Sequence, residues 1–173
     1  MSERSQAILH EIRHQKEEMS SIEEELARSF VSFRVGNGWY GIDVEHVEGV
    51  IRVRDLRITD IPSVPSYIMG ITHVRGEILS VVNLRSLLEL PEEEWDPLDP
   101  CLLMVSHQGV MTALYVDDLD DLIDLRPSVL LSSRSRPDRP DFIKGEAQVE
   151  GKVVTLIDAA RLLTSEKMCV GGG

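Results

Sequence analysis

The sequence has few cysteines and no long apolar run, and each shortage excludes a class of protein. Its two cysteines among 173 residues, Cys101 and Cys169, do not form the spaced framework that small disulfide-stabilised domains need. No apolar stretch approaches the roughly 20 residues that cross a bilayer, and the N-terminus lacks the basic-then-apolar layout of a signal peptide. We therefore expect a reduced, cytoplasmic protein with no direct membrane insertion. A chain of this length can bury roughly 70% of its unfolded surface, which is enough for a core without disulfides.

Basic residues are missing from a long central stretch. Between Glu89 and Leu125 there is no Lys or Arg, and the formal net charge of the whole chain is -12. The acidic residues of this stretch are Glu89, Glu92, Glu93, Glu94, Asp96, Asp99, Asp117, Asp118, Asp120, Asp121 and Asp124. Such a surface repels phosphate backbones, which proteins bind through clustered Lys and Arg, so we expect no nucleic acid partner. The acids form either a solvated face or a docking face for a basic partner.

The residue patterns that enzymes need are also absent. An enzyme requires a nucleophile or base with partners nearby, or a set of metal ligands. His46, His73 and His107 lie at predicted hairpins or strand ends, with no cysteine in a suitable order and no GxSxG motif. We predict no catalytic residues, no cofactor and no metal site, and we expect these histidines to be ordinary surface or edge residues.

One short pattern, His10-Glu11-Ile12-Arg13-His14, matches the HExxH motif in which two histidines bind zinc and the glutamate acts as base. A catalytic zinc ion needs a walled cavity with supporting groups around its ligands. Here His10 and His14 project from the side of the helix opposite the apolar stripe, and no third ligand is evident. The pattern therefore does not predict a zinc hydrolase.

Residues 1–29 predict an amphipathic helix. A heptad seam with one polar member runs along it through Ile8, Ile12, Gln15, Met19, Ile22 and Leu26, and the positions between are mostly Glu, Arg, Lys and Ser. About two and a half heptads are marginal as an isolated helix, so the apolar stripe should be buried against something. The sequence leaves two alternatives open: docking on the chain's own β domain, or contact with a second copy or a partner helix.

The rest of the chain repeats itself. IMGITHVRGEILSVVNLRSLL (68–88) matches IKGEAQVEGKVVTLIDAARLL (143–163) at a constant offset of 75 residues, and each predicts strand, tight glycine turn, strand and short helix. VEHVEGVI (44–51) has the same apolar and acidic spacing as VDDLDDLI (116–123), at an offset of 72. Two internal repeats that occur in the same order predict two similar β halves.

Each half is predicted to begin with a β-hairpin. FVSFRV and WYGIDV flank Gly36-Asn37-Gly38, where Asn-Gly is expected to supply the positive φ of the turn, and CLLMVS and VMTALYV flank a turn at residues 107–109. In the strand that follows the first hairpin, Val47, Val50 and Ile51 are expected to face inward, with a bulge or bend at Gly49.

We divide the chain into an N-terminal helix (1–29), a main domain (30–170) and a flexible tail (171–173). The main domain has a first half of about 30–90 and a second half of about 101–165, joined by an acidic connector that contains Pro91 and Pro100.

The β region resembles the CheW family of chemotaxis coupling proteins over roughly residues 30–164. The resemblance is carried by FRVGNGWYGIDVEHV, IPSVPSYIMGITHVRGEILSVVNLR, YVDDLDDLI and IKGEAQVEGKVVTLIDAARLL. The second segment is the most specific, because its proline pair, its glycine, its Arg-Gly turn and Asn83-Leu84-Arg85 closely follow the family signature.

The resemblance implies a mainly β fold, with two intertwined five-stranded SH3-like barrels, short helices and the N-terminal helix. It also implies a non-catalytic scaffold that joins the cytoplasmic tip of a chemoreceptor to the regulatory domain of a CheA-type histidine kinase, and so reaches membrane receptor arrays only through its partners. The positions that match interface residues of the family are Arg75, Gly70, Val47, Gly49, Leu119 and Leu122. Arg75 should be exposed, because Glu150 occupies its place in the second repeat.

Some residues depart from the family pattern. Gly49 replaces a usual Glu, His73 an Asn, Ser80 a Pro and Asn83 an Asp. The loss of a carboxylate at position 49 removes one possible ion pair at an interface, and the N-terminal helix is an addition. We therefore expect a specialised coupling protein, serving an alternative chemosensory pathway. The competing hypothesis is an oligomeric structural or regulatory module assembled through the heptad helix.

Overall fold

The computed structural model describes residues 3–25, 27–91, 96–126, 130–131 and 138–169. The predicted flexible tail at 171–173 lies outside this range. The helices are α1 (Glu3–Glu25), α2 (Leu84–Leu87), α3 (Ala159–Thr164) and α4 (Glu166–Cys169), with 3-10 turns η1 (Val44–His46) and η2 (Val53–Asp55). The strands are β1 (Arg28–Val35), β2 (Gly38–Asp43), β3 (Val47–Arg52), β4 (Ile58–Thr59), β5 (Ile68–Val74), β6 (Glu77–Asn83), β7 (Cys101–His107), β8 (Val110–Val116), β9 (Asp118–Leu125), β10 (Leu130–Leu131), β11 (Ile143–Val149) and β12 (Lys152–Ile157).

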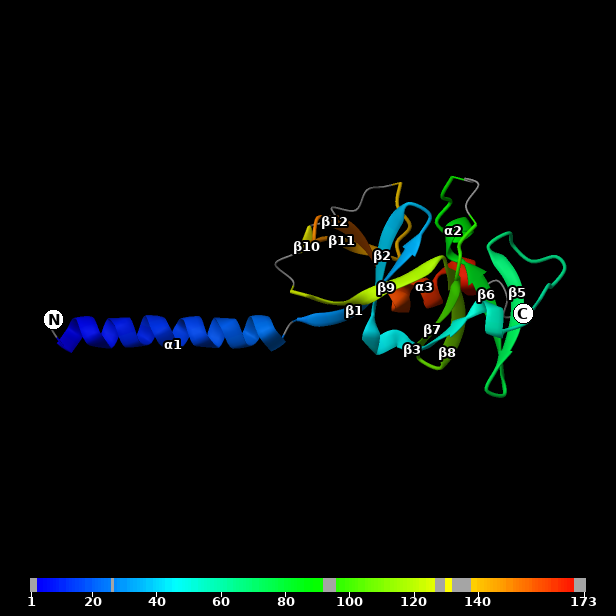
Figure 1. The fold of residues 1–173 in the computed structure, drawn as a ribbon. Coiled ribbons are helices and arrows are strands. Elements are labelled where there is room, and N and C mark those ends of the chain that lie inside the picture. The colour runs from blue at the N-terminus through cyan, green and yellow to red at the C-terminus, as the bar shows by residue number, and fades with distance from the viewer. Residues whose placement is uncertain (1–2, 26, 92–95, 127–129, 132–137, 170–173) are drawn as a thin grey trace.

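The strands form two sheets with the same internal order (Figure 1). Sheet A runs β10-β11-β12-β2-β1-β9 and sheet B runs β4-β5-β6-β8-β7-β3. Each sheet takes strands from both halves of the sequence, so the predicted mainly β, intertwined fold is confirmed. Each has five strands of six to eight residues, as the resemblance implied, and a sixth strand of only two residues, β10 or β4, at one edge.

The sequence repeat corresponds to equivalent structural units. β5, β6 and α2 form the first copy of the longer repeat, and β11, β12 and α3 form the second. Asn83 and Asp158, which are 75 residues apart, each cap the following helix by accepting a hydrogen bond from a backbone N–H, that of Arg85 or of Arg161. Strands of the two halves meet in four pairings: β2 with β12 and β6 with β8 are parallel, and β1 with β9 and β3 with β7 are antiparallel.

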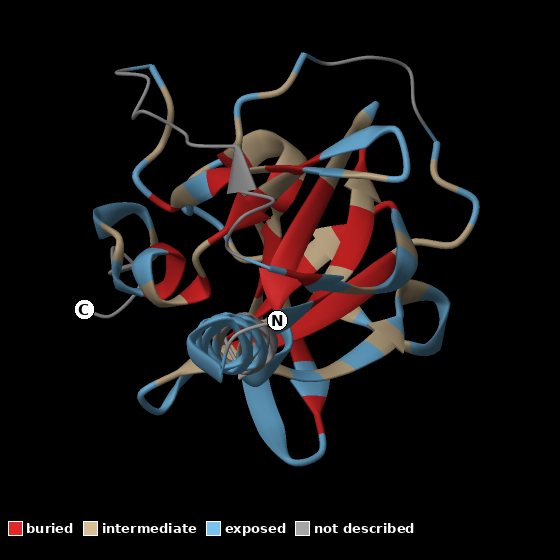
Figure 2. Cartoon of the chain, turned by 90° about the vertical axis from the view of Figure 1, so that its left-hand side faces the viewer, coloured by how far each residue is buried: buried red, intermediate tan, exposed pale blue. Residues whose placement is uncertain are grey.

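The buried apolar residues fall into three clusters. Sheet A has its own cluster (Phe30, Leu125, Ala147, Val154 and Leu156), and so does sheet B (Val74, Leu79, Val81, Leu102, Met104 and Ala113). A larger central cluster lies between the sheets and includes Phe33, Val35, Tyr40, Ile42, Leu84, Leu87, Leu103, Val105, Leu114, Val116, Leu162 and Leu163. Neighbouring residues of β7 therefore point into different clusters, which explains its continuous apolar run. Figure 2 shows these buried strands inside the domain.

Three hairpin turns have positive φ at both central residues: Arg75-Gly76, Gln108-Gly109 and Glu150-Gly151. The first hairpin differs from its prediction. Its loop is Gly36-Asn37, because Val35 pairs with Gly38, and Gly36 rather than Asn37-Gly38 provides the positive φ of 58°. Glycine at the first central position fits a two-residue turn of the II′ type, so the turn lies one residue earlier than the Asn-Gly rule predicted.

Helix α1 extends away from the β domain (Figure 1), and Figure 2 views it end-on with its described residues exposed. Residues 3–18 are all exposed, including Ile8 and Ile12, so this part of the seam is not docked on the chain's own sheets. The seam residues Met19, Ile22 and Leu26 lie outside the residues whose side chains are described. Among the described helices, none is long and apolar enough to cross a membrane.

Gly70 lies where β5 passes close to β4. Its φ is 146°, and a Cβ at this position would lie 2.2 Å from the carbonyl oxygen of Thr59. The pairing of β5 with β6 also shifts register between Ile68 and Gly70, and β11 repeats this bulge between Ile143 and Gly145. Only glycine fits such a backbone approach, so Gly70 is required for β4 to pair with β5.

We predict that Gly70→Ala lowers the free energy of unfolding by at least about 3 kcal/mol, because backbone strain and a backbone clash add together. Urea unfolding followed by circular dichroism measures the change. Gly76→Ala is the matched control, since Gly76 also has positive φ but a Cβ there meets no atom within 4 Å. Equal losses in the two variants would contradict the role given to the Thr59 contact.

Candidate partner-binding surfaces

The tip of the β5–β6 hairpin presents Arg75 to solvent, as predicted. Arg75 is the first residue of the turn, with φ of 50°, and no described residue forms an ion pair with it. His73 and Ile78 pair across the same hairpin, and both are exposed, Ile78 at 68%. We name His73, Arg75, Glu77 and Ile78 the hairpin surface. It combines a cation with an apolar side chain, which suits a partner with both apolar and acidic groups.

β3 is the edge strand of sheet B and pairs with β7. The pairing shifts register between Val47 and Gly49, so of the bulge and the bend that the sequence left open at Gly49, the structure has the bulge. Val47 is half-buried against the central cluster, and Ile51 packs against the sheet B cluster. Val50 was expected to face inward, but it is 39% exposed, because burial alternates along β3 and the adjacent Ile51 takes the inward position.

β9 is the equivalent edge strand of sheet A and pairs with β1. Leu119 is half-buried against the central cluster, as Val47 is, and the two residues are 72 positions apart. Leu122 stands at the same offset from Val50 and is 64% exposed. The two edge strands thus present similar apolar residues in similar positions. We call Val47, Gly49 and Val50 the β3 edge, and Leu119 and Leu122 the β9 edge.

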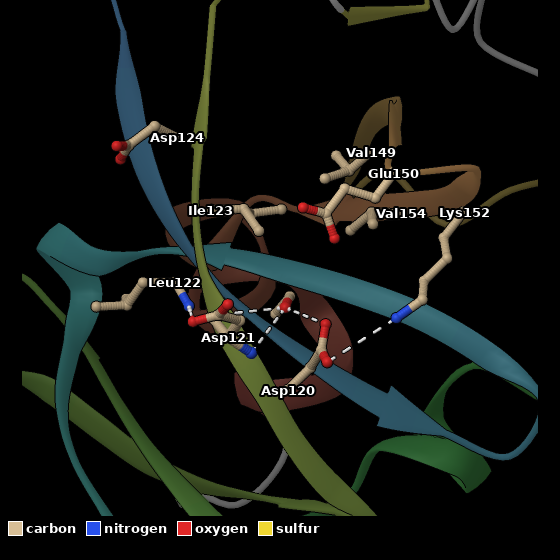
Figure 3. Close-up of a pocket in the computed structure, with 10 residues that line it drawn as sticks. Asp120, Asp121, Leu122, Ile123, Asp124, Val149, Glu150, Lys152 and Val154 are labelled. Carbon is tan, nitrogen blue, oxygen red and sulfur yellow. Dashed lines mark hydrogen bonds and ion pairs between the residues drawn. The ribbon is translucent and has the colours of Figure 1, made fainter.

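A pocket of about 290 Å³ lies beside β9, between that strand and the β11–β12 hairpin (Figure 3). Four carboxylates and one amine line it: Asp120, Asp121, Asp124, Glu150 and Lys152. The Nζ of Lys152 lies 4.0 Å from a carboxylate oxygen of Asp120 and 3.9 Å from the centre of the Trp39 ring. Leu122 lies on the opposite side of the strand from Lys152 and Glu150 in the figure. The four carboxylates outnumber the single amine, so the pocket beside β9 has a net negative formal charge.

Ser32 fixes the backbone of β9 beside this pocket. The pairing of β1 with β9 shifts register between Val31 and Phe33, and Ser32 is 1% exposed at that bulge. Its hydroxyl accepts a hydrogen bond from the N–H of Asp121 at 3.1 Å and donates to the carboxylate of Asp120 at 2.9 Å. The serine therefore satisfies a backbone group that the bulge removes from the ladder. Nothing in the sequence pattern singled it out.

We predict that Ser32→Ala lowers the free energy of unfolding by about 1 kcal/mol, because the partly buried N–H of Asp121 loses its acceptor. The exposed Ser66 provides a control, since Ser66→Ala should change stability by less than about 0.5 kcal/mol. Urea titration compares the two, and amide hydrogen exchange at Asp121 should accelerate only in Ser32→Ala. Slow exchange at Asp121 in that variant would show that the hydroxyl is dispensable.

The described residues do not form a catalytic site. Burial raises the pKa of the Cys101 thiol, so it is a poor nucleophile. His10 and His14 lie on the exposed helix α1, where His14 faces Glu18 at 3.6 Å and no cavity surrounds them. No group of three or more His, Cys, Asp or Glu side chains in the described part of the chain could hold a metal ion.

The structure distributes the six predicted interface residues over separate places. Val47 and Leu119 pack against one central cluster, whereas Arg75 lies at a hairpin tip, and β7, β8 and β6 separate its strand from β3 in the sheet order. Gly70 is buried, and a Cβ at this position would meet the backbone of β4. The sequence analysis did not identify Ile78 as an exposed residue. The second repeat has an apolar residue at the equivalent position, Val153, and it too is exposed.

Two β sheets that exchange strands, with apolar edge strands and an exposed arginine turn, define the class as a mainly β domain of intertwined halves. Comparison with known proteins identifies the family. The family model of the CheW-like domain matches residues 29–167, and the chain belongs to that family. It is similar to the chemotaxis protein CheW of Klebsiella aerogenes (27% identical, covering 85% of this chain and 88% of that one) and of Treponema pallidum (28%, covering 80% and 83%).

Among solved structures, the scaffolding protein TtCheW of Thermoanaerobacter tengcongensis superposes with a TM-score of 0.71 and 24% identity. The match covers 81% of this chain and 94% of that one, and it supports the same fold. The chain is therefore a member of the CheW-like family that shares the fold of TtCheW. Helix α1 precedes the segment that the family model matches.

Proposed function

We propose that this chain holds a chemoreceptor tip and a CheA-type histidine kinase together in the cytoplasm, through surfaces that lie apart on the domain. A coupling protein has to contact two partners at once. The hairpin surface and the β9 edge belong to different sheets, so one partner can occupy each without competing for the same residues. The observation that supports this most strongly is the exposed Arg75 at a turn whose equivalent in sheet A carries Glu150.

The two surfaces differ in charge, which gives each a preferred partner chemistry. The hairpin surface offers one guanidinium and one carboxylate beside an exposed isoleucine, whereas the β9 edge offers Leu122 beside three carboxylates, those of Asp120, Asp121 and Asp124. Opposite charges across an interface steer encounter and suppress incorrect partners. We assign the kinase regulatory domain to the hairpin surface and the receptor tip to the edge strands. Gly49, in place of a family glutamate, leaves the β3 edge with one carboxylate fewer and fits a specialised pathway.

We predict that Arg75→Glu weakens binding to the kinase regulatory domain of the same organism by at least about tenfold, because arginine is enriched among interface hot spots, whose loss costs about 2 kcal/mol or more. The substitution should not disturb the fold, since Glu150 adopts nearly the same φ (48° against 50°) in the equivalent turn. Isothermal titration calorimetry measures the affinity.

The matched control is Glu150→Arg, which makes the reciprocal substitution in the other sheet. It should leave kinase affinity within about twofold, because surface substitutions away from a contact have small effects. Unchanged affinity in Arg75→Glu would move the kinase contact away from the hairpin surface. Equal weakening in both variants would show a general charge effect instead.

A second proposal concerns helix α1, because the apolar residues in its described part are exposed to solvent. Ile8, Leu9 and Ile12 are 56%, 44% and 44% exposed, although they belong to the apolar seam or border it. A second copy of the helix is a suitable occupant. Glu11 stands immediately before the seam residue Ile12, and Lys16 immediately after the seam residue Gln15. In a parallel pair of helices, Glu11 of one chain therefore lies beside Lys16 of the other, and their charges are opposite.

We predict that the full chain forms a dimer at about 0.1 mM and that Ile12→Glu makes it monomeric, because a charge in the seam is desolvated on pairing. Gln6→Glu adds the same charge on the outer face and should leave the dimer intact. Light scattering coupled to gel filtration measures the mass. A monomeric wild-type chain, or a dimer that Ile12→Glu does not change, would contradict pairing through the helix.

A further inference from the structure

Two histidines that are 61 positions apart in the sequence meet at the edge of sheet B. His46 ends the 3-10 turn η1 immediately before β3, and His107 ends β7. Their ring centres are 5.3 Å apart and their planes are inclined at 63°. Both rings are half-buried. The antiparallel pairing of β3 with β7, in which Val47 lies opposite Val105, brings these residues together.

A hydrogen bond fixes the orientation of one of these rings. The Nδ1 of His46 lies 3.1 Å from the carbonyl oxygen of Ser106, the residue that precedes His107. A carbonyl oxygen can only accept a hydrogen bond, so Nδ1 carries the proton and Nε2 of the neutral ring keeps its lone pair. This is the arrangement that orients histidine ligands in metal proteins, where the nitrogen away from the metal donates to a carbonyl or carboxylate.

The spacing and the charge around the pair favour a divalent cation. Since a Zn–N bond is about 2.0–2.1 Å long, two imidazoles that share a tetrahedral zinc ion have ring centres about 5 Å apart. The segments that carry the rings, residues 35–51 and 89–125, contain no Lys or Arg. The carboxylate of Glu48 is held close to the pair, because it accepts a hydrogen bond from the hydroxyl of Ser106 at 2.5 Å.

We propose that His46 and His107 form a binding site for a borderline-soft transition-metal ion such as Zn²⁺, through one nitrogen of each ring. Water or a group from a bound partner completes the coordination, since zinc takes four ligands and the pair supplies two. The ion would connect the start of β3 to the end of β7. It would therefore stiffen the β3 edge beside Val47 and Gly49, the residues proposed to contact a partner. This inference does not depend on the identity of that partner.

The test is a calorimetric titration of the full chain with zinc chloride at pH 7.5. His10 and His14 are replaced by alanine in every sample, because two histidines one turn apart on an exposed helix also bind zinc. We expect one ion per chain, with affinity at least about tenfold weaker in both His46→Ala and His107→Ala. His73→Ala removes an exposed histidine of the hairpin surface. It should bind zinc with the same affinity as the chain in which only His10 and His14 are replaced.

A second measurement keeps the test independent of how well the variants fold. In the chain in which only His10 and His14 are replaced, the imidazole signals of His46 and His107 should shift together in the NMR spectrum on addition of zinc, while those of His73 stay in place. Loss of binding in both variants, with joint shifts in the spectrum, would support the site. No binding in the parent, affinity that either substitution leaves unchanged, or shifts at only one of the two rings would overturn it.

Discussion

The central apolar cluster between the two sheets is the interaction on which the rest of the structure depends. It draws side chains from the first hairpin, from β7 and β8, and from both capped helices, so it joins every part of the repeated architecture. Fully burying one side chain such as Leu103 or Phe33 contributes roughly 1.5–3 kcal/mol, and this cluster contains many such residues. Because Val47 and Leu119 pack against it from opposite edge strands, it also sets where the proposed contact surfaces lie. The scaffold is therefore a single body rather than two barrels connected by a linker.

Much of the fold followed from local sequence signals. The repeats predicted equivalent strand–turn–strand–helix units, and the turn glycines predicted three of the hairpin connections, because positive φ restricts the choice of residue. The exchange of strands between halves was implied only by the family resemblance, since periodicity does not reveal which strands pair. Two details differed: the first turn uses Gly36, and Val50 is exposed beside the bulge at Gly49. Of the two alternatives that the sequence left open for helix α1, its described apolar residues are not docked on the β domain.

The candidate surfaces were harder to predict than the fold. The resemblance identified Arg75 and Leu122, both exposed, together with Gly70, which is buried and closely approached by the backbone of Thr59. Ser32 was missed because a buried serine inside an apolar strand has no sequence signature until the bulge is known. His46 and His107 were interpreted as isolated edge residues, because the pairing of β3 with β7 is a long-range property. Residues that act through tertiary neighbours are the ones that pattern reasoning does not reach.

The two parallel pairings have a consequence for how the chain is made. β2 is complete by residue 43, yet its neighbour in sheet A, β12, begins at residue 152, so more than half of the protein has to leave the ribosome before that sheet can close. Until then the first hairpin carries an unpaired edge and an apolar face, which is the condition that favours aggregation during synthesis. Contacts this distant in sequence also slow folding, because loop closure precedes the pairing that compensates for it. A scaffold built in this way should acquire its structure late and all at once, rather than barrel by barrel.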